Sequence, residues 1–335
     1  MSILVTGGAG FVGSHLVRQL VEAGQKVKVL VRPTSNLGNL AGLEFEKAVG
    51  DLRDYDSLVK AVEGCDLVYH CAADYRLWAS DPRELYTNNV QGTDNLLRAC
   101  QKGKVERVVV TSSVAAVGIP KGGGEGNEDT PVTLEDMVGD YKRSKFLAEK
   151  LAVKYAQEGQ DIVIVNPSTP IGDGDSRPTD TGKSITRFLN GQMPAFVNTG
   201  LNLVDVEDVC KGHILAAQKG QSGRRYILGG YNMSLEEILQ ELADITGLEA
   251  PKVELPWQFA YVIGFIDTAL CVNVLKREPH VPLDGVKMAR KKMYFSWDRA
   301  YKELGYLPGS VRVALQKAVA WFIKNGYAPN FGGKR

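Results

Sequence analysis

The chain has 335 residues, of which 44% are hydrophobic and 24% charged, with a formal net charge of +1 at pH 7. This length and hydrophobic content suffice for the core of one large domain or two lobes. The balanced charge argues against a nucleic-acid partner, which would need a basic footprint. The five cysteines are widely spaced and have neither zinc nor redox spacing, so we expect reduced thiols, no metal site and a cytoplasmic protein. Because an apolar strand begins at residue 2, we expect no signal peptide before the fold.

The order of apolar runs predicts the fold. Strand-like runs occur at 3–6, 27–31, 66–70, 106–111 and 162–166, and helical patterns occur at 11–23, 54–62, 83–101 and 135–158. This alternation predicts an α/β fold with a Rossmann-like, doubly wound parallel sheet, which binds ligands at the carboxyl ends of its strands. Beyond about residue 170 the alternation weakens, and helical patterns recur near 182–190, 206–218, 234–246 and 310–325. We therefore expect a cofactor-binding domain over 1–170 and a smaller, mostly helical substrate lobe over 171–335, with an interleaved boundary.

A glycine-rich turn follows the first predicted strand. Gly7, Gly10 and Gly13 would allow a sharp turn, a close approach of a pyrophosphate and tight packing of helix against strand. The helix that begins at Phe11 and Val12 would direct its positive N-terminal dipole at the phosphates. Since the turn lies between a strand and a helix, the sequence predicts a dinucleotide site here.

A second motif adds catalytic side chains to this site. Tyr141 and Lys145 are four residues apart, so they share one face of a predicted helix. Ser112 and Ser113 end the strand at 106–111, at the edge of the sheet where ligands bind. Each feature alone is also typical of a solvated helix face or an ordinary strand end, but their combination indicates an enzyme.

With these motifs the chain resembles the extended short-chain dehydrogenase/reductase family, in particular the hopanoid-associated sugar epimerases and dihydroflavonol-4-reductase-like proteins. The similar segments are the glycine turn and 31–35, 72–78, 111–115, 141–145, 165–170, 288–293 and 303–306. The resemblance implies an NAD(P)-dependent reductase or epimerase and a connection with hopanoid biosynthesis. The sequence leaves open whether the protein forms a homodimer or touches a membrane.

The resemblance also implies roles for individual residues. Tyr141 would be the acid/base, Lys145 would favour its phenolate and hold the nicotinamide ribose, and Ser113 would donate a hydrogen bond to the substrate oxygen. Ser112 would face the cofactor, and Asp51 would contact the adenine. The expected cofactor contacts are Gly7, Gly10, Phe11, Val12, Gly13, Arg32, Ser35, Asp51, Leu52, Ala72, Ala73, Ser112, Tyr141, Lys145 and Pro167.

The end of the second strand indicates the cofactor type. NAD-preferring relatives have a carboxylate here, whereas this chain has Val31 followed by Arg32. An arginine would bind a 2′-phosphate through charge-assisted hydrogen bonds, and Ser35 and Asn36 offer further donors. We therefore expect NADP(H) rather than NAD(H), although Arg32 could also be an exposed residue that happens to end a strand.

Three departures from the family pattern narrow the activity. Val114, Ala115 and Ala116 replace the acidic pair of sugar dehydratases, and Val114 also replaces the cysteine of the 3,5-epimerising reductases. Leu201 replaces the arginine that clamps the diphosphate of nucleotide sugars. We therefore expect a reductase acting on a small or lipid-linked carbonyl or alcohol. A sugar epimerase that recycles its cofactor is the alternative, followed by a non-catalytic NADP(H)-binding regulator, which would more typically lack Tyr141 or Lys145.

Three further features bear on the substrate. Tyr75, Arg76, Trp78 and Asn166 are the expected substrate contacts, because they follow the ends of predicted strands. The apolar segment 255–275 is interpreted first as a buried helix, with a wall for a lipid-like substrate or a membrane-contacting surface as alternatives. The glycine-rich loop 121–130 is either a lid over the site or a flexible connection.

Overall fold

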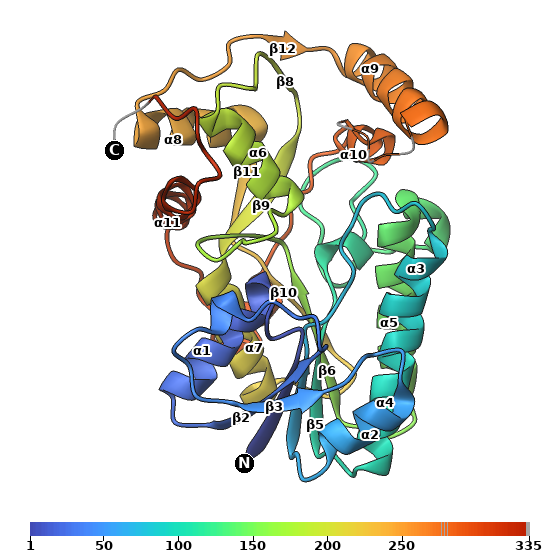
Figure 1. Ribbon diagram of the computed structural model, residues 1–335. Coiled ribbons are helices and arrows are strands. Elements are labelled where there is room, and N and C mark those ends of the chain that lie inside the picture. Colours follow the sequence, from blue (N-terminus) through green and yellow to red (C-terminus); the bar gives the residue numbers. More distant parts are fainter. Residues whose placement is uncertain (276, 278, 280, 333–335) are drawn as a thin grey trace.

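A computed structural model describes residues 1–275, 277, 279 and 281–332 of the chain. Its larger half is built on a seven-stranded sheet in the order β10-β6-β5-β4-β1-β2-β3 (Figure 1). The strands are β1 (Ser2–Thr6), β2 (Lys26–Val31), β3 (Glu46–Val49), β4 (Leu67–His70), β5 (Arg107–Thr111), β6 (Ile162–Pro167) and β10 (Arg225–Leu228). All six neighbouring pairs are parallel. This architecture confirms the predicted Rossmann-like sheet, whose strand order reverses between β1 and β4 and so opens a ligand crevice there.

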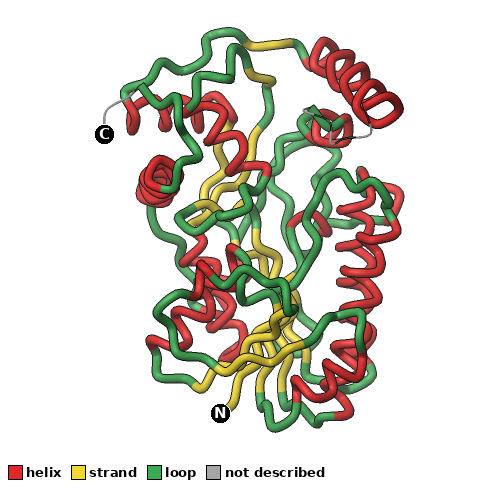
Figure 2. Tube along the Cα trace, viewed as in Figure 1, coloured by secondary structure: helices red, strands yellow, loops and turns green. Residues whose placement is uncertain are grey.

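Helices cover both faces of this sheet (Figure 2). On one face, α1 (Phe11–Glu22) packs against α7 (Val206–Lys219), and on the other α2 (Tyr55–Val62), α4 (Gly92–Lys102) and α5 (Gly139–Gln157) pack together. The central strands β1, β4, β5 and β6 are mostly apolar and buried on both faces, as is typical of a parallel sheet, and every residue of β6 is buried. One apolar cluster fills each interface between sheet and helices.

The expected helix at 83–101 is interrupted. It consists of α3 (Arg83–Tyr86), a π turn over Thr87–Gln91 and then α4. The expected helix at 135–158 begins later than predicted, because Gly139 has a left-handed φ of 77°. A Cβ atom at Gly139 would lie 2.8 Å from Oδ2 of Asp284, so this turn brings the start of α5 against the C-terminal half of the chain.

The smaller half combines helices with two small sheets. The helices α6 (Asp180–Leu189), α8 (Leu235–Thr246) and α11 (Val311–Lys324) share an apolar cluster. They accompany a sheet of β7 (Thr169–Ile171), β9 (Gly200–Asp205) and β11 (Tyr231–Ser234) and a pair of β8 (Phe196–Val197) and β12 (Glu254–Leu255), which were not expected. Residues 276, 278, 280 and 333–335 of the predicted lobe lie outside the described residues.

The interpretation of 255–275 as a buried helix is wrong. This segment forms α9 (Trp257–Ala269) and a π turn over Leu270–Leu275, and Gly264 is the only buried residue of α9. The helix lies at the periphery beside α10 (Leu283–Met288), at the top right of Figure 1. Apolar composition did not distinguish an inward from an outward helix. Among the residues that the structure describes, no helix combines the length and hydropathy that crossing a bilayer requires.

Candidate active site

The glycine turn forms a cradle at the carboxyl end of β1. Gly7 has a φ of 69°, and a Cβ atom there would lie 2.6 Å from the backbone nitrogen of Ala72. A Cβ atom at Gly13 would lie only 2.2 Å from the carbonyl oxygen of Gly7, so both positions require glycine. Helix α1 has no side-chain cap at Gly10 and no acidic residue in its first turn. Its free N–H groups, next to Phe11 and Val12, therefore suit a pyrophosphate.

Arg32 follows β2 and is exposed beside a surface hollow that it shares with Asp51 and Arg53. The backbone nitrogen of Arg32 donates to Oγ of Ser35 over 3.0 Å, which closes a turn directly after β2. Arg53 donates to both carboxylate oxygens of Asp51, at 2.9 and 2.8 Å, and this hydrogen bonding lowers the pKa of Asp51 to about 2. The carbonyl of Leu52 accepts from Asn95. The hollow therefore combines the guanidinium groups of Arg32 and Arg53 with two carboxylates, Asp51, which Arg53 neutralises, and Asp54.

Tyr141 and Ser113 meet at the carboxyl ends of the central strands. Ser113 is the second residue after β5 and follows Ser112. Its hydroxyl oxygen accepts from the backbone nitrogen of Ala115 over 3.1 Å. Burial raises the pKa of Tyr141 above its usual value, while a hydrogen bond with the Ser113 side chain acts in the opposite direction. The two hydroxyl groups are thus close enough to share one substrate oxygen.

Lys145 lies one turn along α5 and is buried. Its ammonium donates to the carbonyl of Thr111 over 2.8 Å. Burial lowers the pKa of Lys145 to about 8, against the opposing influence of Glu149 and Cys71. A positive charge held this close to the cofactor-binding edge can stabilise a phenolate and donate to a ribose hydroxyl.

Asn166 does not line an open cleft. It is fully buried at the end of β6, next to Pro167, and its amide donates to the carbonyl of Ser113 at 3.0 Å and to Glu149 at 2.6 Å. Glu149 in turn pairs with Arg225 of β10 at 2.8 Å. These contacts hold the backbone that carries Ser113. The sequence indicated the position of Asn166 at a strand end, but not the direction of its side chain.

Asn89 is a supporting residue that sequence reasoning missed. It lies in the π turn, where its amide oxygen accepts from the backbone of Asp74 over 2.7 Å and its amide nitrogen donates to Ser144 over 2.9 Å. It thereby ties the segment after β4 to the helix that carries Tyr141. Two adjacent asparagines in a predicted helix were the available signal, because asparagine disfavours helix interiors.

The predicted substrate residues after β4 occupy the rim of the site. Tyr75 is 44% exposed, and its hydroxyl donates to the carbonyl of Arg177 over 3.1 Å. Arg76 is held by the carboxylates of Asp74 and Glu84, at 2.6 and 2.8 Å. Trp78 is half-buried in the same segment. Tyr75 therefore bridges the two halves of the chain, whereas the charge of Arg76 is already neutralised.

The remaining predicted cofactor contacts also lie along this edge. Ala72 donates its backbone N–H to Oγ1 of Thr6 over 3.3 Å, and Ala73 is exposed. The hydroxyl of Ser112 is buried, and none of the residues that the structure describes forms a hydrogen bond with it. A buried hydroxyl without a partner is costly, and a bound cofactor would offer it one.

The glycine-rich loop 121–130 is anchored over its second half. Glu128 is buried, and its carboxylate accepts from the backbone of Ile227 over 2.8 Å. Glu125 accepts from Asn232, and Asp129 pairs with Arg299. Residues 121–124 are exposed, whereas these contacts anchor the second half of the loop, which favours a connection over a lid.

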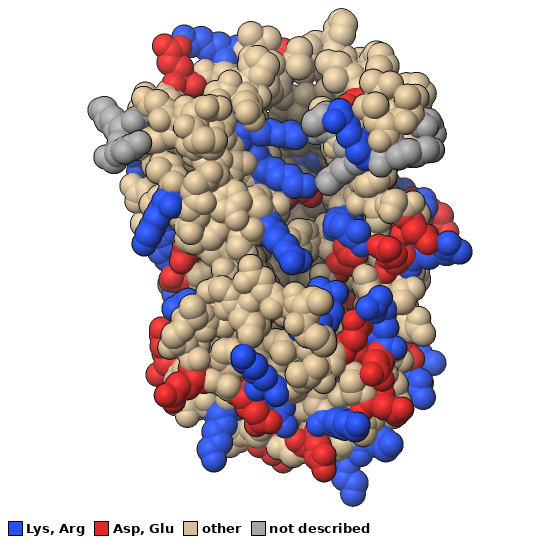
Figure 3. Space-filling view, viewed as in Figure 1, with Lys and Arg blue, Asp and Glu red and all other residues tan. Residues whose placement is uncertain are grey.

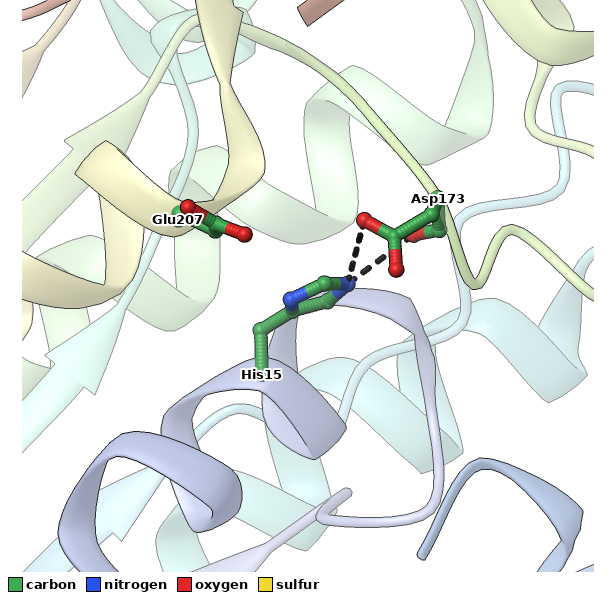
Figure 4. Close-up of side chains that lie close together, drawn as sticks. All are labelled: His15, Asp173 and Glu207. Carbon is green, nitrogen blue, oxygen red and sulfur yellow. Dashed lines mark hydrogen bonds and ion pairs between the residues drawn. The ribbon is translucent and has the colours of Figure 1, made fainter. Parts of the chain in front are cut away.

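One polar cluster at this edge was not predicted (Figure 4). His15 of α1, Asp173 after β7 and Glu207 of α7 bring their side chains within 4.8 Å of one another. The Nε2 atom of His15 lies 2.9 Å from the carbonyl oxygen of Asp173 and 3.8 Å from its carboxylate. Because Nε2 already has this partner, the cluster acts as a tie between α1 and the segment that follows β7.

The sheet, the glycine cradle and the Ser113–Tyr141–Lys145 group define a dinucleotide-dependent enzyme. Residues 3–229 match the NAD dependent epimerase/dehydratase family. The chain belongs to this family of NAD(P)-dependent enzymes, the extended short-chain dehydrogenases/reductases, as the sequence predicted.

Named relatives are similar over nearly the whole chain. A Synechocystis sp. protein named dihydroflavonol 4-reductase is 49% identical to this chain, and the match covers 96% of this chain and 95% of the Synechocystis protein. Sterol demethylase protein B of Methylococcus capsulatus is 36% identical, covering 97% of this chain and 99% of its own. The crystal structure of gox2253 aligns with a TM-score of 0.88 at 43% identity, covering 97% of this chain and 99% of its own.

Proposed function

We propose that this protein is an NADP(H)-dependent reductase that acts on a carbonyl group of an uncharged, lipid-like compound, or on the corresponding alcohol. The observation that carries the proposal is the buried ammonium of Lys145, which donates to the carbonyl of Thr111 over 2.8 Å one helical turn from Tyr141, beside the Ser113 side chain. All five cysteines are free, which fits the reducing environment of the cytoplasm.

The cofactor would be held along the carboxyl edge of the sheet. The cradle of Gly7 and Gly13 and the uncapped start of α1 suit its pyrophosphate. Arg32 and its neighbour Arg53 suit a 2′-phosphate, which a carboxylate at the end of β2 would repel. When bound, the nicotinamide would supply or accept the hydride.

The side chains of the chain itself would handle the oxygen and the proton. Ser113 and Tyr141 would donate hydrogen bonds to the carbonyl oxygen, and Tyr141 would pass it a proton as the alcohol forms. Burial raises the pKa of Tyr141, so a positive charge is needed to make its phenolate accessible. Lys145 would provide that charge once its ammonium leaves the carbonyl of Thr111.

The substrate class follows from the neighbours of Leu201. This residue of β9 is paired with Met233 of β11 on one side and with Met293 on the other. Leu201 thus has a methionine opposite it in each neighbouring segment, at the position where nucleotide-sugar enzymes of the family have an arginine. A relative of this chain, 36% identical to it, is named for sterol demethylation, which also suits an apolar substrate.

A sugar epimerase is the second candidate. Lys and Arg side chains border the hollow at the centre of the face in Figure 3, and such a border favours an anionic substrate. In that case the cofactor would be recycled without net consumption. A regulator without turnover is less well supported, because Ser113, Tyr141 and Lys145 are all retained.

A thermal-shift panel with NADP⁺ present separates the two candidates, because a ligand that binds only the folded state raises the melting temperature. We expect sterol-like ketones and alcohols to stabilise the protein, and nucleotide-diphosphate sugars to have no effect. Stabilisation by a nucleotide sugar alone would favour the epimerase. Replacing Leu201 by Arg is the matched control, and it should weaken the response to the apolar compounds.

A further inference from the structure

Helix α9 presents a large apolar surface to the solvent. Its outer side, together with the first residue of the following turn, is here called the α9 face and consists of Phe259, Val262, Ile263, Phe265, Ile266 and Leu270. These side chains are between 49% exposed, for Leu270, and 64% exposed, for Phe259. Isolated exposed apolar residues are common, but a continuous group of this kind marks an interaction site.

The opposite side of the helix is fixed to the protein. Gly264 is buried, and a Cβ atom there would lie 3.0 Å from the side chain of Val286. Trp257 donates from its indole nitrogen to the carbonyl of Val286 over 2.8 Å. Asp267, the only charged residue of α9, accepts from the backbone of Val281 over 2.7 Å. The helix therefore keeps Trp257, Gly264 and Asp267 toward the protein and its large aliphatic and phenylalanine side chains outward.

An exposed arginine lies near each end of α9, and the one at the start stacks on Trp257, on the protein-facing side of the helix. At the start of the helix, the guanidinium of Arg290 lies 5.3 Å from the centre of the Trp257 ring, and Arg290 is exposed. At the other end, Arg277 is exposed and its backbone donates to the carbonyl of Cys271. Glu254, in β12, is the exposed acidic residue that precedes the helix. An apolar strip between arginines is the pattern of helices that lie in the interface of an anionic bilayer.

We propose that the α9 face docks the protein onto the surface of an anionic lipid bilayer. The helix would lie in the membrane plane, with its apolar side among the acyl chains and the two arginines among the headgroups. A second copy of the chain fits less well. A helix of 13 residues is about 20 Å long and about 10 Å wide, so one side of it covers much less area than the roughly 800 Å² that a stable dimer buries on each partner.

This surface adjoins the mouth of the site. Helix α10 packs against α9, and a Cβ atom at Gly285 of α10 would lie 3.8 Å from the side chain of Leu77, in the segment between Tyr75 and Trp78. Asp284 of the same helix contacts Gly139, two residues before Tyr141. A docked α9 would thus hold the rim of the site at the bilayer, where a lipid-like substrate resides. This link rests on the proposed function, whereas the docking itself does not.

The test is co-sedimentation of the full chain with vesicles, either phosphatidylcholine alone or phosphatidylcholine with phosphatidylglycerol. We expect binding to the anionic vesicles that weakens with salt, and a loss of at least about tenfold in partitioning for the double variant F265S/I266S. The control is L307S/V313S, which removes two side chains that are 68% and 46% exposed elsewhere. It should bind as the wild type does.

The outcomes separate docking from catalysis. Equal vesicle binding by F265S/I266S and the wild type would overturn the proposal, as would no vesicle binding at all. A wild-type dimer that F265S/I266S converts to a monomer, measured by light scattering without vesicles, would assign the face to a second copy instead. Reduction of a water-soluble ketone should be unchanged in F265S/I266S. If no ketone is reduced by either protein while vesicle binding persists, the proposed function fails and the docking stands.

Discussion

The buried amine of Lys142 should lower the free energy of unfolding of the protein. This residue follows Tyr141 in α5, is 9% exposed, and its amine contacts the sulfur of Met293 at 3.9 Å. Burial, assisted by the charge of Lys291, lowers the pKa of Lys142 from 10.5 to about 8. That difference corresponds to about 3 kcal/mol of destabilisation while the amine is charged in both the folded and unfolded states. Methionine has a similar length and no charge, so Lys142→Met should remove the cost.

The pH dependence gives the sign of this effect. Between about pH 8 and pH 10.5 the unfolded chain binds the proton and the folded chain does not, so this lysine makes stability rise with pH across that window. In urea unfolding, the free energy of unfolding of Lys142→Met should exceed that of the wild type by up to about 3 kcal/mol at neutral pH. The two proteins should differ little near about pH 10.5, the upper end of this pH window. The control Lys154→Met, at a 68% exposed position of the same helix, should stay within about 0.5 kcal/mol of the wild type. A variant that is less stable than the wild type at neutral pH would refute the reasoning.

Three further substitutions test the site. Gly13→Ala forces a Cβ atom to within 2.2 Å of the carbonyl oxygen of Gly7 and should cost about 1–3 kcal/mol in urea unfolding as well as weakening NADPH binding, whereas Gly122→Ala, with open space around it, should change neither. Tyr141→Phe should lower turnover by about 10²- to 10⁴-fold and leave the NADPH dissociation constant, measured by fluorescence, within about twofold. Arg32→Ala should weaken NADPH binding by about tenfold to a hundredfold and leave NADH binding unchanged, and a wild type with equal affinity for both cofactors would show that the arginine is incidental.

The strands of the sheet could be predicted from sequence where an apolar run is followed by a helical pattern. Five strands were expected near their observed positions, because their apolar runs alternate with amphipathic helices. Strand β3 was missed because its four residues, Glu46–Val49, include two charges. Strand β10 was missed because it pairs with β6 across about 60 residues of intervening chain, and local pattern carries no information on such pairing.

The parts of the site that could be predicted are those in which the spacing of residues along the sequence determines their chemical role. The glycine turn and the four-residue spacing of Tyr141 and Lys145 led to the family, because backbone freedom and helical geometry are visible in sequence. The supporting contacts of Asn89 and Asn166 were not predictable, since they depend on which strand ends become neighbours. The orientation of α9 could not be predicted either, because an apolar helix has the same sequence pattern whether it faces a core, a substrate or a bilayer.

The stoichiometry of cofactor consumption tests the central claim most directly. Purified protein is mixed with NADPH and an uncharged, sterol-like ketone, and both NADPH oxidation and alcohol formation are measured for the wild type and for Tyr141→Phe. We expect the wild type to consume one NADPH for each alcohol formed, and Tyr141→Phe to consume almost none. The contradicting result is no NADPH consumption with any uncharged ketone, together with epimerisation of a nucleotide sugar in which the cofactor is recycled.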